Sequence, residues 1–222
     1  MKKVFVSFLV VFFAFSGSYA QKDPKAKEIL DQVSVKIKSF SSIKARFTNK
    51  MDNAQEKISE TLEGTLFLKG KKYKMEALGM TTFCDGVTKW VYMKESNEVN
   101  ISDVSKMTEE EKSGNLLADP SQIFTLYEKG FKYQFIEEYS EKGKNLVLIE
   151  LVPEDKDKPF FKIKLVIDKA TMVPQSLHYF GKEGTKYFVD IKEFTPNTKM
   201  EDAMFTFNPA KYEGVEVIDM RE

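Results

Sequence analysis

The stretch Thr82-Phe83-Cys84-Asp85-Gly86-Val87-Thr88-Lys89-Trp90-Val91-Tyr92 predicts two β-strands joined by a tight turn. An Asp-Gly pair between β-forming residues is the strongest short-range signal for a hairpin, because glycine readily adopts the positive φ that the turn needs. The stretch also holds the only Trp and the only Cys of the chain. Short alternating runs continue on both sides, so we expect this hairpin to lie in the middle of one large curved sheet.

Upstream of the hairpin, apolar and polar residues alternate with a period of two. The apolar positions form three sets: Ile43, Ala45 and Phe47; Ile58, Leu62, Leu66 and Leu68; and Tyr73, Met75 and Ala77. Strands that are apolar on one face and polar on the other are typical of an antiparallel meander. This alternation predicts that Arg46 points outward. We interpret Cys84 as a small buried strand residue, with intermolecular pairing as the alternative, since a single Cys forms no internal disulfide.

Two segments predict helices instead. Asp23-Pro24 is a typical N-cap and first-turn pair, and apolar residues then recur every three or four positions, which predicts an amphipathic helix over residues 24–40. A second helix starts at Asp119-Pro120 and runs to Glu128. It is apolar around most of its circumference, so it must either be covered or itself cover an apolar surface.

Downstream of residue 130 the strand pattern returns and continues almost to the end of the chain. The alternating runs lie near residues 131–135, 146–151, 163–167, 175–180, 187–191, 205–207 and 214–219, and Gly181 to Gly184 reads as a hairpin loop. The whole chain therefore predicts eleven or twelve strands and two helices, arranged as one sandwich or barrel. We find no linker and no internal repeat, so residues 21–222 are interpreted as a single domain.

The first 20 residues have the three-part pattern of a secretory signal peptide. Lys2 and Lys3 precede a 12-residue run from Val4 to Phe15 that is apolar except for Ser7, and small residues lead to a cut after Ala20. The run is shorter than the roughly 20 residues that span a bilayer. The mature chain, with 32 basic and 34 acidic residues once Lys2 and Lys3 are removed, is expected to be soluble and to bind no nucleic acid.

The sequence offers little for catalysis. His178 is the only histidine, it lies between Leu177 and Tyr179 in a predicted strand, and we interpret it as an ordinary strand residue. The chain contains no Gly-rich phosphate loop, no G-x-S-x-G and no HExxH motif. We therefore expect no enzyme, no cofactor and no metal site, and a hydrolase with an unrecognised site is kept as the alternative.

A binding role is better supported, although periodicity alone does not distinguish a packed core from a cavity. The apolar second helix and the ten methionines favour a cavity for an apolar ligand, because the thioether side chain adapts to irregular surfaces.

Several motifs, taken in order, resemble the periplasmic outer-membrane lipoprotein carrier proteins of the LolA-like family. Residues 84–92 resemble the family's S-D-G-K-T-L-W-F-Y hairpin, and residues 39–48 its S-S-F-x-A-x-F-T passage from helix to strand. Residues 63–69 match x-G-x-L-x-x-K, and residues 205–221 are similar to its F-x-F-x-P…G-V-x-V-x-D-x-R ending.

The resemblance implies an α+β fold: a strongly curved, incomplete antiparallel β-barrel of about eleven strands, closed by helices that form a lid over a hydrophobic cavity. It implies a periplasmic chaperone that carries acylated lipoproteins from the inner to the outer membrane. Its partners would be an inner-membrane lipoprotein-releasing ABC transporter and an outer-membrane acceptor, and the protein would be a monomer. The expected lipid-binding residues are Phe47, Leu62, Leu66, Leu68, Tyr73, Met75, Trp90, Tyr92, Ile123, Phe124 and Tyr127.

One position departs from the family pattern. Members often place an Arg just after the x-G-x-L-x-x-K strand, where it fastens the closed lid, but Gly70 stands in that place here. The Arg-fastened lid therefore does not carry over. The alternative to a carrier is a lipid- or glycolipid-binding or sensory module of the same fold, which holds its ligand without transporting it. For Trp90 and Tyr92, the face on which they lie stays open.

Overall fold

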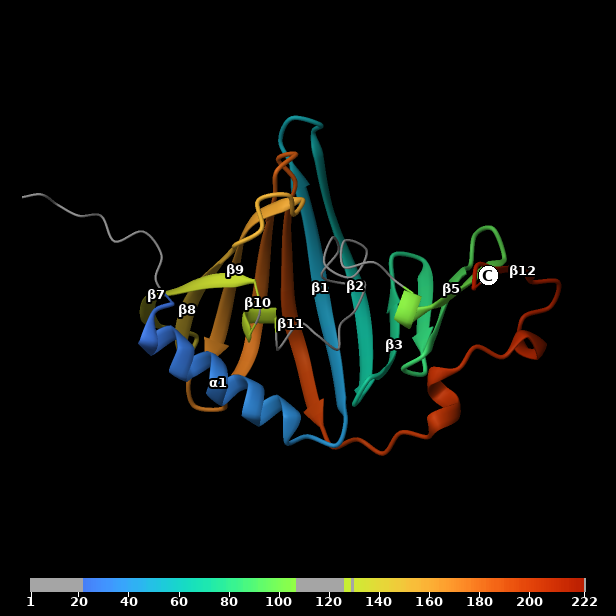
Figure 1. Ribbon diagram of the computed structural model, residues 1–222, viewed down its shortest axis with the longest axis horizontal. Helices are drawn as coiled ribbons and strands as arrows, with labels where there is room; N and C mark the ends of the chain where they lie inside the picture. Colours follow the sequence, from blue (N-terminus) through green and yellow to red (C-terminus); the bar gives the residue numbers. More distant parts are fainter. Residues whose placement is uncertain (1–21, 107–125, 129, 222) are drawn as a thin grey trace, which may run out of the picture.

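The computed structural model describes residues 22–106, 126–128 and 130–221. Within these residues, twelve strands form one sheet in the spatial order β12-β6-β5-β4-β3-β2-β1-β11-β10-β9-β8-β7. All neighbours are antiparallel except β12 and β6, which pair in parallel. The strands at the two ends of this order, β7 and β12, do not pair with each other, so the sheet curls without closing (Figure 1). The predicted α+β fold with a curved, incomplete barrel is confirmed, with twelve strands.

The strands follow the predicted alternation with one exception: residues 205–207, predicted as a strand, form the end of a short 3-10 helix and the loop after it. The strands are β1 (Ile43–Asn53), β2 (Ile58–Lys69), β3 (Lys72–Ala77), β4 (Met80–Cys84), β5 (Thr88–Met93), β6 (Glu98–Asp103), β7 (Phe131–Glu141), β8 (Lys144–Pro153), β9 (Phe160–Asp168), β10 (Val173–Gly181), β11 (Lys186–Pro196) and β12 (Glu216–Asp219). Among the residues that the structure describes, four short 3-10 helices lie between or beside the strands: η1 (Val104–Lys106), η2 (Leu126–Glu128), η3 (Asp202–Phe205) and η4 (Pro209–Lys211).

The opening hairpin forms as β4 and β5. Asp85 Oδ1 accepts hydrogen bonds from the N–H groups of Val87 and Thr88 at 2.9 and 2.8 Å, which fixes the turn, and Gly86 takes a φ of 98°. Cys84 is 2% exposed, so its prediction as a buried strand residue is confirmed.

The helix α1 (Pro24–Lys38) begins as predicted, with Asp23 as its N-cap: Asp23 Oδ1 accepts from the N–H of Lys25 at 2.8 Å. Its apolar stripe packs into the main core beside buried residues of β7, β8 and β9, and the helix lies across this part of the sheet (Figure 1). We call the sheet face that α1 covers the inner face. The second predicted helix, from Asp119 to Glu128, lies largely outside the described residues, as does the predicted signal peptide; the structure describes only η2 at its end.

The outer face of β4, β5 and β6 is covered by residues 197–215, which we call the C-terminal strap. Phe207 and Tyr212 of the strap stack on each other with ring centroids 4.6 Å apart, and both rings contact Tyr92. Asp202 at the start of η3 pairs with Lys69 and Lys72, each at 2.8 Å. The strap therefore builds a second, smaller core on the side of the sheet opposite α1.

Candidate functional site

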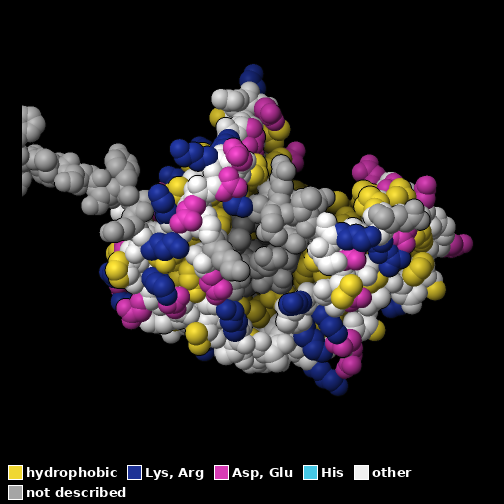
Figure 2. Space-filling view, in the orientation of Figure 1, with side chains coloured by type: hydrophobic (Ala, Val, Ile, Leu, Met, Phe, Trp, Pro, Cys, Tyr) yellow, Lys and Arg dark blue, Asp and Glu magenta, His cyan; other side chains and the backbone are white. Residues whose placement is uncertain are grey.

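The inner face contains apolar side chains that the protein does not fully bury. Strand register places them on the same face as the main core, because directly paired residues of neighbouring strands project to one side. They come from β2, β3, β5, β10 and β11, and each is half-buried: Leu62, Met75, Val91, Leu177, Val189 and Ile191. We call this set the inner apolar surface. Figure 2 shows hydrophobic side chains gathered around the middle of this face.

The predicted lipid-binding residues fall into four groups in the structure, the fourth of which is Trp90 and Tyr92. Leu62 and Met75 belong to the inner apolar surface. Five others are buried in the main core: Phe47, Leu66, Leu68, Tyr73 and Tyr127. Ile123 and Phe124 lie outside the described residues.

Trp90 and Tyr92 require a correction. Cys84, which lies in the main core, is paired with Lys89, whereas Phe83 is paired with Trp90, so Trp90 projects to the outer face. There Trp90 and Tyr92 pack against Phe83 and the C-terminal strap. They are therefore not wall residues of an inner cavity, because the strap occupies the face on which they lie.

One polar residue of the inner face, Asn49, was not predicted from the sequence as a functional residue. Asn49 continues the inward alternation of Ala45 and Phe47 in β1 and is paired with Leu62 on one side and Val189 on the other. It is 6% exposed, and its Oδ1 is buried without a hydrogen-bond partner among the described residues. Its position in the alternation was the available signal, since an amide at an inward-facing strand position needs a partner.

The contact between α1 and η2 is polar at its edge. Tyr127 is 6% exposed, and its hydroxyl donates to Asp31 Oδ1 on α1 at 3.1 Å. Burial, assisted by the nearby Asp31 carboxylate, raises the pKa of Tyr127 to about 12. Glu128 accepts from Ser34 at 3.3 Å and from Lys38 at 3.0 Å, so η2 is held along the helix by three hydrogen bonds.

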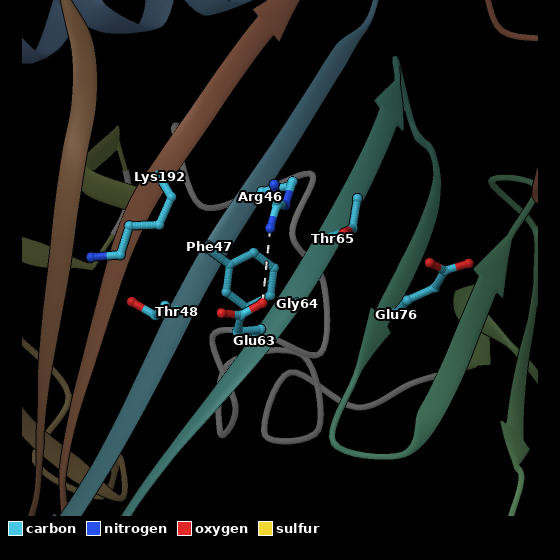
Figure 3. Close-up of a pocket in the computed structure, with 8 residues that line it drawn as sticks. All are labelled: Arg46, Phe47, Thr48, Glu63, Gly64, Thr65, Glu76 and Lys192. Atoms are coloured by element: carbon cyan, nitrogen blue, oxygen red, sulfur yellow. Dashed lines mark ion pairs between the residues drawn. The ribbon is translucent and has the colours of Figure 1, made fainter.

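Arg46 points outward, as predicted. It lies over a polar depression of about 140 Å³ on the outer face, with Glu63 Oε2 at 3.9 Å from its guanidinium (Figure 3). The guanidinium also donates to Glu193 Oε1 at 2.8 Å. Lys192, Thr65 and Glu76 also line this depression. The set is charged and opens on the side opposite α1, so Arg46 does not fasten a lid over the inner face.

Gly70, which replaces the family Arg, lies with Lys71 in the two-residue turn between β2 and β3 and has a φ of 61°. A side chain is strained in this conformation, which gives a physical reason for glycine here.

A larger groove of about 580 Å³ lies where β10 and β11 separate. Their pairing stops at Ser176 and Asp190, and β11 continues to Pro196 paired with β1 on its other side. Apolar residues of β10, β11 and the loop after α1 line the groove together with four charged ones: Lys36, Lys144, Lys192 and Asp168.

The described residues contain no group of three His, Cys, Asp or Glu side chains that could hold a metal ion. His178 lies in β10 against the ring of Phe188, with centroids 5.0 Å apart, and burial lowers its pKa. Among the same residues, no helix combines the length and the apolar character needed to cross a bilayer.

Comparison with known proteins identifies the family. The family described as "Outer membrane lipoprotein carrier protein LolA" matches residues 16–185, which is more than half of the chain. The chain belongs to the LolA family. No curated protein sequence matches it. The sequence resemblance to this family is thereby confirmed, and the Gly70 departure is a variation within it.

Several solved structures are distantly similar to the chain. An uncharacterized conserved protein from Thermus thermophilus is 16% identical with a TM-score of 0.58, and the match covers 88% of this chain and 99% of that one. A LolA superfamily protein from Nitrosomonas europaea is 12% identical with a TM-score of 0.44, covering 82% and 97%. The lipoprotein LppX from Mycobacterium tuberculosis is 10% identical with a TM-score of 0.49, covering 81% and 98%. At 16% identity, the Thermus structure supports the fold alone.

Proposed function

We propose that this LolA-family protein binds the acyl chains of lipoproteins on its inner apolar surface and carries them through the periplasm from the inner to the outer membrane. The observation that carries the proposal is that six apolar side chains stay half-buried on the inner face: Leu62, Met75, Val91, Leu177, Val189 and Ile191. A surface of this kind, on the face that also carries α1, suits a long apolar ligand.

The physical need for such a carrier is large. Exposing a palmitoyl-sized chain of about 15 methylenes to water costs about 12 kcal/mol of free energy, at about 0.8 kcal/mol for each methylene. Membrane and protein site are both apolar, so transfer between them is nearly neutral in free energy. In this scheme, a lipoprotein-releasing ABC transporter supplies the cargo, an outer-membrane acceptor removes it, and the carrier works as a monomer without enzymatic activity.

A charge on the inner apolar surface tests where the ligand lies. Leu62→Glu should lower uptake of a fluorescent acyl probe by delipidated protein at least about tenfold, because a buried carboxylate must be desolvated. The matched control is Thr61→Glu, the adjacent exposed position on the outer face, which should bind the probe as wild type does. Equal uptake by both variants, each shown to be folded by circular dichroism, would place the ligand elsewhere.

A second assay distinguishes transport of a lipoprotein from binding of a lipid without transport. Inner-membrane vesicles that contain a triacylated lipoprotein are incubated with the purified protein and the transporter, and the lipoprotein released in complex is measured. Probe binding without release would favour the lipid- or glycolipid-binding or sensory role over the carrier role.

A further inference from the structure

Asn49 is the exceptional polar residue of the inner face. It lies in the middle of β1, and its two directly paired neighbours, Leu62 and Val189, are both members of the inner apolar surface. The side chain is 94% buried, yet Oδ1 accepts no hydrogen bond within the described part of the chain. A buried carbonyl oxygen without a donor is costly, because it has lost water and gained nothing in return.

A second asparagine on the same strand shows how this protein normally treats a buried amide. Asn53 lies four residues further along β1, on the same face, and is 1% exposed. Its Nδ2 donates to Thr185 Oγ1 at 2.9 Å, and its Oδ1 accepts from the N–H groups of Gln55 and Glu56 at 3.0 and 3.1 Å. Asn53 is therefore satisfied from within the protein, and Asn49 differs from it in having an oxygen that is free to accept.

The apolar surroundings restrict what can supply the missing donor. Leu62, Val189 and Phe47 surround the position on the inner face, so a charged donor such as an ammonium would lose its hydration there without a counter-ion. A neutral N–H group loses much less. In lipids and acylated proteins, the acyl chain is attached through an ester or thioester, which has no hydrogen to donate, or through an amide, whose N–H can donate.

We propose that Asn49 selects acyl ligands whose chain is attached through an amide, by accepting a hydrogen bond from the amide N–H to its Oδ1. The inference rests on the proposed function and deepens it, because it names the chemical class of ligand that the inner apolar surface prefers. The N-linked chain of an acylated amino terminus belongs to this class, whereas a diacylglycerol belongs to the disfavoured one. Asn49 contributes specificity, and the apolar neighbours contribute most of the affinity.

A pair of neutral ligands that differ in one atom group tests the proposal. N-palmitoylethanolamine and 2-hydroxyethyl palmitate have the same acyl chain and the same hydroxyethyl group, and differ only in N–H against ester oxygen. Each is titrated against a fluorescent acyl probe bound to delipidated wild-type protein. We expect the amide to bind up to about tenfold more tightly, the range that one net hydrogen bond supplies.

Variants show whether Asn49 is the source of the preference. Asn49→Leu should bind the two ligands equally while retaining affinity for the ester. Thr61→Ala, at an exposed position on the outer face of β2, should keep the preference because it leaves the inner face unchanged.

The outcomes separate this inference from the proposed function. Equal binding of amide and ester by wild type overturns the selectivity of Asn49 and leaves acyl binding in place, and this measurement does not depend on the folding of any variant. A preference that survives in Asn49→Leu also overturns it. If wild type binds neither ligand, the proposed function fails and the inference fails with it.

Discussion

Replacing Asn49 by leucine should stabilise the ligand-free protein. The native side chain is 6% exposed with its Oδ1 unpartnered among the described residues, and such a group costs about 1–3 kcal/mol. Leucine has the same number of side-chain heavy atoms with the same branching and no polar atom, so its packing against Leu62 and Val189 adds apolar burial without a desolvation penalty. We expect the free energy of unfolding to rise by about 1–3 kcal/mol, which for a chain of this length raises Tm by about 2–4 °C per kcal/mol.

The matched control is Asn53→Leu on the same face of the same strand. This change leaves the buried Thr185 hydroxyl and the N–H groups of Gln55 and Glu56 without their partner, so it should destabilise the protein by about 1–3 kcal/mol. The two substitutions are chemically identical, and their opposite signs come from hydrogen bonding alone.

Urea denaturation of delipidated protein, followed by far-UV circular dichroism, measures both effects. The midpoint should move up for Asn49→Leu and down for Asn53→Leu, with the slope unchanged in each case. A loss of stability in Asn49→Leu as large as that in Asn53→Leu would refute the reasoning, because it would mean that Asn49 Oδ1 already has a donor. A gain in stability together with loss of the amide preference would show a residue kept for binding at the expense of stability.

Three further predictions concern other parts of the molecule. Gly64→Ala should destabilise the protein by about 1–3 kcal/mol in the same denaturation assay, because the new Cβ would lie 2.4 Å from Cζ of the Phe47 ring. Hydrogen bonds from Lys69, which has the larger effect, and from Lys72 lower the pKa of Asp202 from 3.8 to about 2. Because the charged carboxylate holds both lysines, attachment of the C-terminal strap should be complete above pH 3.8 and weaken as the pH falls toward 2. Asp202→Asn should show faster strap amide exchange already at pH 7, and unchanged exchange would contradict this. Emission from Trp90 should respond to Asp202→Asn but change little on acyl binding, since its ring lies on the outer face; a large shift with ligand would place the ligand there.

Much of the fold follows from local chemistry that is readable along the chain. Alternation with a period of two placed Ala45 and Phe47 on one face of β1 and Arg46 on the other, and the structure agrees, because pleating fixes the side of each residue relative to its neighbours. The α1 helix begins at its predicted cap. These features depend on a few adjacent residues, so no tertiary contact is needed to predict them.

Which segment covers which face of the sheet could be seen only in the tertiary structure. Alternation places Trp90 and Tyr92 on one face of their strand, but it does not show whether α1 or the C-terminal strap covers that face, because the cover depends on contacts between residues far apart in sequence. The parallel pairing of β12 with β6 has the same origin.

The hairpin at residues 82–92 was readable from its Asp-Gly turn, and the family from its ordered motifs. For Asn49, the sequence predicted only that its amide side chain points to the inner face. Whether such an amide has a donor depends on every element packed around it, so its unpartnered oxygen, and the ligand chemistry inferred from it, could come from the folded molecule alone.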